Sequence, residues 1–161
     1  MLTSAVTIAA DWQVSAWFNT QAPISLVQLR GQVVLLHAFQ MLCPACVSHA
    51  LPQAERVFRQ YADAGVAVIG LHTVFEHHAA MAPVALEAFL HEYRVTHPVA
   101  VDRPSAGDPI PQTMRRYAMQ GTPTLMLIDR NGHRRWQEFG LIDDLSLGVW
   151  IGRLLAESTA A

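Results

Sequence analysis

The chain contains two cysteines, Cys43 and Cys46, within the segment HAFQMLCPACVSHALP at 37–52. A hydrophobic run precedes the pair and a helical pattern follows it, so we expect both residues at a helix N-terminus. The free N–H groups and the helix dipole there favour a thiolate. Pro44 suits a first helical turn because it has no N–H to lose. The spacing predicts a redox couple in which Cys43 attacks a disulfide and Cys46 resolves the mixed disulfide.

Two other interpretations of the pair are open from the residues alone. Both cysteines would serve as small apolar side chains in a core, or both would bind a metal ion. Thiolates select copper(I) or zinc, and three histidines are candidate third ligands for such a metal carrier: His72, His77 and His78. Copper chaperones that join a cysteine pair to a distant histidine have three residues between their cysteines rather than two, so we expect no metal here.

The composition excludes several other classes of protein. Hydrophobic residues make up 52% of the 161 residues and charged residues 15%, which is typical of a folded domain. A formal net charge of −2 gives no general attraction for nucleic acid or anionic lipid, so neither is an expected partner. The opening residues lack a signal-peptide pattern, and no apolar run is long enough to cross a membrane. We therefore expect a cytoplasmic protein, where a close cysteine pair is catalytic or metal-binding.

Helical and strand patterns alternate along the chain. Apolar runs predict strands, and an Asn-Gly pair in the segment RNGH predicts a tight hairpin that pairs the fourth strand with a fifth; the strands are expected at 32–39, 65–71, 97–102, 124–129 and 135–139. Apolar stripes at helical spacing predict helices around 54–61, 86–93 and 147–154. The early strand–helix–strand units require parallel pairing, while the hairpin is antiparallel. The fold class is therefore α/β, with a mixed central sheet and helices on both faces.

Three segments in this order resemble the thioredoxin-fold redoxins, most closely the TlpA-like and AhpC/TSA-like proteins. VVLLHAFQMLCPACVSHALP is similar to their active-site segment, ISLVQLRGQVVLL to their lead-in, and GTPTLMLIDRNGH to their cis-proline segment. The resemblance covers roughly 17–156 and implies one thioredoxin-like α/β/α domain over 1–161. It also implies a redoxin-type insertion at roughly 72–111.

The resemblance implies a thiol–disulfide oxidoreductase whose only redox group is the Cys43–Cys46 disulfide, with no other cofactor. Its expected partners are a disulfide-bearing protein or small molecule and an upstream thiol reductant. Thr122–Pro123 would be a cis bond that presents the Thr122 backbone to the substrate. Leu42 stands where thioredoxins usually have tryptophan, so the rim that binds the substrate, with Pro44, would be more aliphatic.

His37 stands six residues before Cys43, where thioredoxins bury an aspartate beneath the cysteines. Strand alternation puts His37 on the same face as Leu35 and Phe39. An imidazole at this place would accept the proton of Cys46 as that thiol attacks the mixed disulfide. The alternative is a neutral core histidine that is bonded to a backbone carbonyl.

A cluster of polar residues follows the second predicted strand. Glu76, His77 and His78 come after a strand end, where sites in α/β proteins usually lie. They would line the rim of the active site, or they would be solvated loop residues.

A thiol peroxidase of the peroxiredoxin type is the second candidate enzyme, because it shares the fold. Peroxiredoxins share a threonine three residues before the reactive cysteine and a proline four residues before that threonine. The corresponding positions here are Gln40 and Leu36, which does not favour specific peroxidase chemistry.

Overall fold

The computed structural model describes residues 6–158. Its strands are β1 (Thr7–Ile8), β2 (Val14–Phe18), β3 (Val33–Phe39), β4 (Val66–His72), β5 (Val99–Asp102), β6 (Thr124–Ile128) and β7 (His133–Phe139). Its α-helices are α1 (Leu51–Tyr61), α2 (Pro83–Glu92), α3 (Gln112–Arg116) and α4 (Asp144–Ala156). A π-helical turn (Cys46–Ala50) leads into α1, and 3-10 turns lie at Val27–Leu29, Ala62–Ala64 and His78–Met81.

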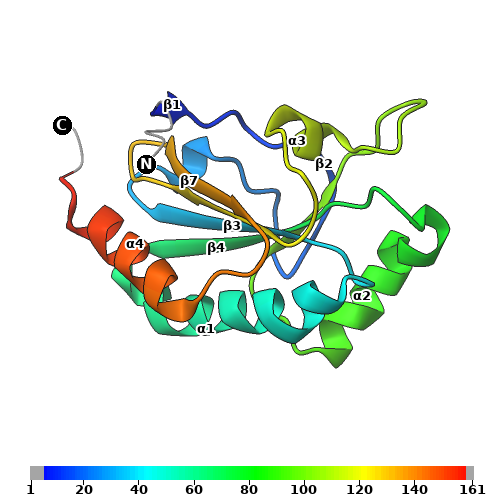
Figure 1. Ribbon diagram of the computed structural model, residues 1–161, viewed down its shortest axis with the longest axis horizontal. Helices are drawn as coiled ribbons and strands as arrows, with labels where there is room; N and C mark the ends of the chain where they lie inside the picture. The colour runs from blue at the N-terminus through cyan, green and yellow to red at the C-terminus, as the bar shows by residue number, and fades with distance from the viewer. Residues whose placement is uncertain (1–5, 159–161) are drawn as a thin grey trace.

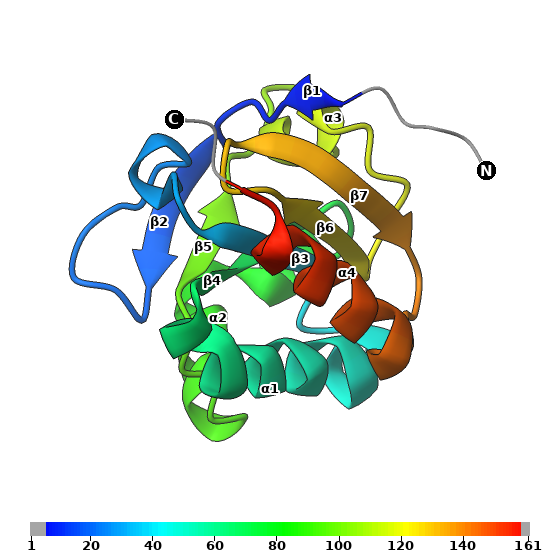
Figure 2. The ribbon, with the colours of Figure 1, turned by 90° about the vertical axis from the view of Figure 1, so that its left-hand side faces the viewer.

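The strands form one mixed sheet in the order β1-β7-β6-β3-β4-β5-β2. The neighbours of β4, strands β3 and β5, are parallel to it, while the β3–β6, β6–β7, β1–β7 and β2–β5 pairs are antiparallel. Figures 1 and 2 show α1, α2 and α4 on one face of the sheet and α3 on the other. The predicted α/β/α class with a mixed sheet is confirmed.

The five predicted strands are present within two residues of their expected bounds, and α1, α2 and α4 each begin three residues before the apolar stripe that predicted them. Pro83 begins α2, and the carboxylate of Asp143 caps α4 by accepting a hydrogen bond from Ser146 N–H at 2.9 Å. The sequence patterns missed β1 and β2. Strand β2 is an edge strand that is only partly buried, so its apolar and polar residues do not alternate clearly.

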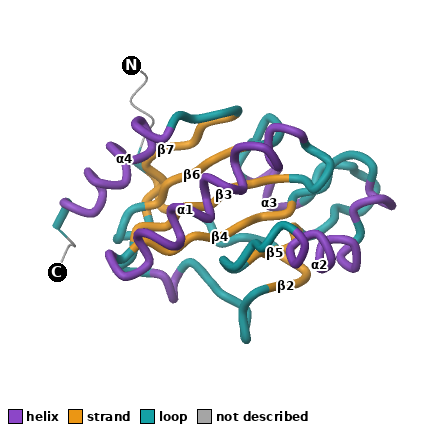
Figure 3. Tube along the Cα trace, turned by 90° about the horizontal axis from the view of Figure 1, so that it is seen from below, coloured by secondary structure: helices purple, strands orange, loops and turns teal. Residues whose placement is uncertain are grey.

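The two faces of β3 pack into different parts of the core. Val34, Leu36 and Ala38 face the α3 side, whereas Val33 and Leu35 face α1 and α4. Figure 3 shows α1 lying over β3 and β4. A third cluster surrounds the C-terminal end of β3, and it includes Phe39, Cys46, Leu51 and two residues of α2, Leu86 and Leu90. The predicted insertion therefore packs behind Cys46.

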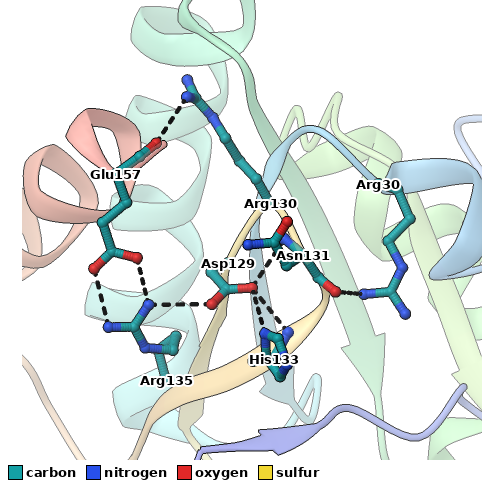
Figure 4. Close-up of polar contacts among 7 residues, drawn as sticks. All are labelled: Arg30, Asp129, Arg130, Asn131, His133, Arg135 and Glu157. Carbon is teal, nitrogen blue, oxygen red and sulfur yellow. Dashed lines mark hydrogen bonds and ion pairs between the residues drawn. The ribbon is translucent and has the colours of Figure 1, made fainter. Parts of the chain in front are cut away.

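A polar cluster fixes the β6–β7 hairpin at the other end of the sheet (Figure 4). The carboxylate of Asp129 accepts hydrogen bonds from the backbone N–H groups of Asn131 and His133, both at 2.9 Å. Arg135 pairs with Asp129 at 3.1 Å and with Glu157 at the end of α4. These bonds fix the turn of the hairpin, while the pairing of β6 with β3 brings the opposite end of β6 to the loop that carries the cysteines.

Candidate active site

The end of β3 and the beginning of β6 bring the cysteines and Thr122–Pro123 together. Ala38 of β3 pairs with Thr124 of β6, so the loop after β3 lies beside the residues that precede β6. The Thr122–Pro123 peptide bond is cis. Cys43 Sγ lies 3.6 Å from the carbonyl oxygen of Thr122. The structure thus places four predicted site residues at one edge of the sheet.

Cys43 and Cys46 form a disulfide, with their Cα atoms 5.2 Å apart. Cys43 is half-buried, whereas Cys46 is 0% exposed. The backbone N–H of Cys46 points at Cys43 Sγ over 3.3 Å. An incoming group can therefore reach Cys43 but not Cys46, and a helix N–H is available to a thiolate at Cys43.

The helix that carries the cysteines contains a local irregularity. Helical structure begins at Pro44 and passes through the π turn Cys46–Ala50 before α1 starts at Leu51. Pro52 lacks the N–H that an α-helix would direct at the carbonyl of Ser48, and its ring crowds that carbonyl. The helix widens just before this proline, where the N–H of Leu51 bonds to the carbonyl of Cys46, five residues back.

Two buried side chains tie down the loop before Cys43. His72 Nε2 accepts a hydrogen bond from Met41 N–H at 3.3 Å, and Gln40 Oε1 accepts one from Phe75 N–H at 3.2 Å. Burial lowers the pKa of His72 to about 4, so its imidazole is neutral at pH 7 and Nε2 is free to accept. The end of β4 and the segment after it therefore position the loop that leads to Cys43.

His37 lies on the predicted face of β3, and its ring stacks on Phe39 with the ring centres 5.3 Å apart. It is 1% exposed. Its Nε2 lies 2.8 Å from Nε2 of His97, so its partner is another imidazole rather than the backbone carbonyl of the alternative interpretation. Among the described residues, its Nδ1 has no hydrogen-bond partner. Burial first, and then the neighbouring His97, hold the pKa of His37 well below its usual value.

Glu55 and His97 are the site residues that the sequence patterns missed. His97 Nδ1 lies 2.6 Å from the Glu55 carboxylate, which also accepts a hydrogen bond from Thr96 N–H at 3.1 Å. Burial opposes ionisation of Glu55, but the bonds from His97 and Thr96 outweigh it and lower the pKa of Glu55 to about 2. The signal in the sequence is only indirect. A buried His37 needs a polar partner, but residue spacing does not identify which residue that partner is.

A small cavity lies beneath the π turn. Its walls include His37, His49, Gln53, Pro123 and Leu141. Its volume is about 10 Å³, counted as the space that the centre of a water molecule can reach, which leaves room for about one water. The cavity therefore connects His37 with the cis-proline side of the active site.

The predicted rim residues lie at different distances from the cysteines. Leu42 is 58% exposed beside Cys43, and Pro44 is also exposed. Glu76 Oε1 accepts a hydrogen bond from Gln40 Nε2 at 3.4 Å, so it lies near the cysteine loop. His78 instead contacts the carbonyl of Pro109 at 3.1 Å in the loop before α3.

Within residues 6–158, no group of three or more histidine, cysteine or acidic side chains is arranged to hold a metal ion. His72, a candidate ligand from the sequence, is buried and directs Nε2 at Met41 N–H. In the same part of the chain, none of the helices is both long and apolar enough to span a membrane.

Comparison with known proteins agrees with this geometry. The crystal structure of the thioredoxin-like superfamily protein SPOA0173 is 48% identical and matches with a TM-score of 0.92, covering 95% of this chain and 99% of that protein. A thiol-disulfide isomerase from Corynebacterium glutamicum is 45% identical with a TM-score of 0.91, covering 96% and 99% of the two chains.

Among curated proteins, Protein DipZ of Mycobacterium tuberculosis (strain CDC 1551 / Oshkosh) is 32% identical over 129 residues, which is 79% of this chain. The chain spans only 17% of the length of that relative. The model of the AhpC/TSA family matches residues 7–137. With its thioredoxin-like fold and its cysteine pair, the chain belongs to the AhpC/TSA family.

Proposed function

We propose that the protein is a TlpA-like thiol–disulfide oxidoreductase that reduces disulfides through the Cys43–Cys46 couple. One observation carries the proposal. The two sulfurs are bonded to each other at a helix N-terminus, with Cys43 accessible and Cys46 fully buried. This asymmetry supports separate attacking and resolving roles.

The reaction consists of two balanced exchanges. The thiolate of Cys43 attacks a substrate disulfide, forms a mixed disulfide and releases one substrate thiolate. The thiolate of Cys46 then attacks Cys43 Sγ, which restores the internal disulfide and releases the second substrate thiol. The substrate gains two electrons, and an upstream thiol reductant returns two electrons to the protein. His37 Nδ1 accepts the proton that Cys46 loses before its attack.

The surface around Thr122–Pro123 supports a disulfide within a protein segment as the substrate. Leu42 and Leu141 are 58% and 59% exposed, and Phe139 is 49% exposed at the end of β7. The N–H of Gly140 bonds to the carbonyl of Pro123, which holds Leu141 beside the cis-proline. An extended substrate segment would pair with the Thr122 backbone and cover these apolar side chains. Net reduction fits a cytoplasmic location, which stays a prediction.

Reduction of insulin by dithiothreitol tests the proposal. We expect the wild-type protein to accelerate the reaction, and the Cys43→Ser variant to leave it at the rate of dithiothreitol alone. A parallel assay replaces insulin with hydrogen peroxide. Peroxide consumption without insulin reduction would contradict the proposal and favour the thiol peroxidase, although Gln40 and Leu36 occupy the positions where that chemistry needs other residues.

A further inference from the structure

Three titratable side chains form a hydrogen-bonded row through the core next to the redox site. The row runs from Glu55 of α1 through His97, which precedes β5, to His37 of β3. Both histidines are buried, and the side chain of Glu55 is 12% exposed. The disulfide exchange itself requires only the two sulfurs and a proton acceptor, so Glu55 and His97 need a separate explanation.

The hydrogen bonds define which nitrogen of each imidazole carries a proton. The Glu55 carboxylate can only accept, so Nδ1 of His97 must carry a hydrogen. In neutral His97, Nε2 is then an acceptor, and the 2.8 Å contact requires that Nε2 of His37 donates to it. Nδ1 of His37 is left with a free lone pair, and it is the atom without a hydrogen-bond partner in the described structure.

The two ends of the row open in different places. At one end, His37 lines the cavity beneath the π turn, together with Ala50 and Pro123. Glu55 lines a groove between α1 and the segment after α2, together with Pro52, Arg59 and Tyr93. The row therefore joins the cavity beneath the π turn to a solvent-facing groove that is separate from the cis-proline rim.

Gly70 of β4 lies against both imidazoles and against Val99, whose Cγ2 would be 3.0 Å from a Cβ atom at this position. A Cβ atom on Gly70 would lie 3.1 Å from Nε2 of His37 and 3.3 Å from Nε2 of His97. Glycine therefore leaves the space in which the two rings meet. This close approach occurs in the middle of β4, where a glycine otherwise weakens a strand.

We propose that Glu55, His97 and His37 form a proton relay that carries the Cys46 proton between the redox site and the groove between α1 and the segment after α2. The proposal rests on the oxidoreductase function and adds two positioning residues to it. The Cys46 thiol, which packs in the same cluster as the Phe39 ring stacked on His37, gives its proton to Nδ1 of His37. The Nε2 proton of His37 moves to His97, and the Nδ1 proton of His97 moves to the Glu55 carboxylate. One proton enters the row, one reaches Glu55, and no electrons are transferred.

Burial and the neighbouring His97 oppose positive charge on His37 and hold its pKa low, so the proton must pass along the row rather than stay on His37. The carboxylate of Glu55 stabilises positive charge on His37 and so favours protonation. Arg59 contacts the same carboxylate at 3.4 Å from the solvent side. His49 of the π turn directs Nε2 at the carbonyl of Ile142, and His72 of β4 directs Nε2 at Met41 N–H. His49 and His72 therefore make their hydrogen bonds outside the row. Within the row, Glu55 supplies the negative charge.

Reduced protein mixed with an equimolar amount of Ellman's reagent separates the two chemical steps. A first release of thionitrobenzoate reports attack by Cys43, and a second release reports resolution by Cys46. We compare wild type with Glu55→Gln, which removes the charge, and with His97→Gln, which keeps hydrogen-bonding capacity but cannot carry a proton. Glu87→Gln on the exposed face of α2 is the matched control.

Both relay variants are expected to slow the second release by about tenfold or more at pH 7, and to move its pH midpoint upward. The first release should stay within about twofold of wild type, as should both releases of Glu87→Gln. A second release as fast as in wild type would overturn the relay while leaving the oxidoreductase function intact. Absence of a second release in wild type would instead overturn the function.

The tautomers test the same proposal on the wild-type protein, without any variant. Nitrogen-15 spectra of the histidine rings should show His97 protonated at Nδ1 and His37 protonated at Nε2 near pH 7. The reverse tautomer at either ring would overturn the relay, because Nδ1 of His37 would then not be the free acceptor or His97 would not donate to Glu55.

Discussion

Cys46→Ser is expected to stop turnover at the mixed disulfide. Cys46 is fully buried, and a serine hydroxyl occupies nearly the same space, so the fold should be retained. Cys43 remains half-buried at the helix N-terminus and can still attack. Because the protein then has no second thiol to displace the substrate, insulin reduction should fall by about a hundredfold or more. When the reduced variant is mixed with insulin after dithiothreitol has been removed, mass spectrometry should find a covalent adduct.

Cys43→Ser is the matched control for this experiment. It leaves only a buried thiol, so no adduct should form within the same time. An adduct on Cys46 in that variant, or no adduct in Cys46→Ser, would contradict the assignment of attacking and resolving roles.

The folded state is expected to lose stability in mild acid because it buries neutral histidines. The pKa of His72 falls from 6.5 to about 4 on folding, and burial also lowers the pKa of His37. The unfolded chain therefore binds protons first as the pH falls below about 6.5. His72 alone should cost about 3 kcal/mol of the free energy of unfolding, with the loss complete near pH 4. Glu55 acts in a lower window: its stabilising effect is present above about pH 4.5 and is lost toward pH 2.

Urea unfolding at pH 7 and at pH 4.5 measures this loss. His72→Gln keeps an acceptor for Met41 N–H but does not titrate. Between pH 7 and pH 4.5, the free energy of unfolding should therefore fall by about 2–3 kcal/mol less in the variant than in wild type. His91→Gln, at an exposed position of α2, should behave like wild type. The same pH dependence in wild type and His72→Gln would show that His72 is not held neutral by burial.

The frame of the site could be predicted because its signals are local in the sequence. A continuous apolar run marks β3, and the Asn-Gly pair marks the β6–β7 hairpin. Together they bring the loop after β3 and the start of β6 to the same edge of the sheet. The placement of His37 beside Phe39 followed from strand alternation, and the stacked rings confirm that face.

The partners of His37 could not be predicted because the contacts join distant segments. His97 is 60 residues from His37, and Glu55 is 42 residues from His97. Eight histidines offered no pattern that distinguished His97 from the others. The need for glycine at position 70 could not be predicted either, because the rings that a Cβ atom there would crowd come from other segments of the chain. Such contacts depend on how α1 and the segment before β5 pack on the sheet.

The reduction potential of the Cys43–Cys46 couple tests the central claim most directly. The protein is equilibrated in graded thiol and disulfide buffers, and its free thiols are alkylated and counted by mass spectrometry. We expect a single two-electron transition, closer to the roughly −270 mV of thioredoxin than to the roughly −120 mV of a strong disulfide donor. A transition near −120 mV would contradict net reduction of substrates. Two free thiols in every buffer would contradict the redox couple itself.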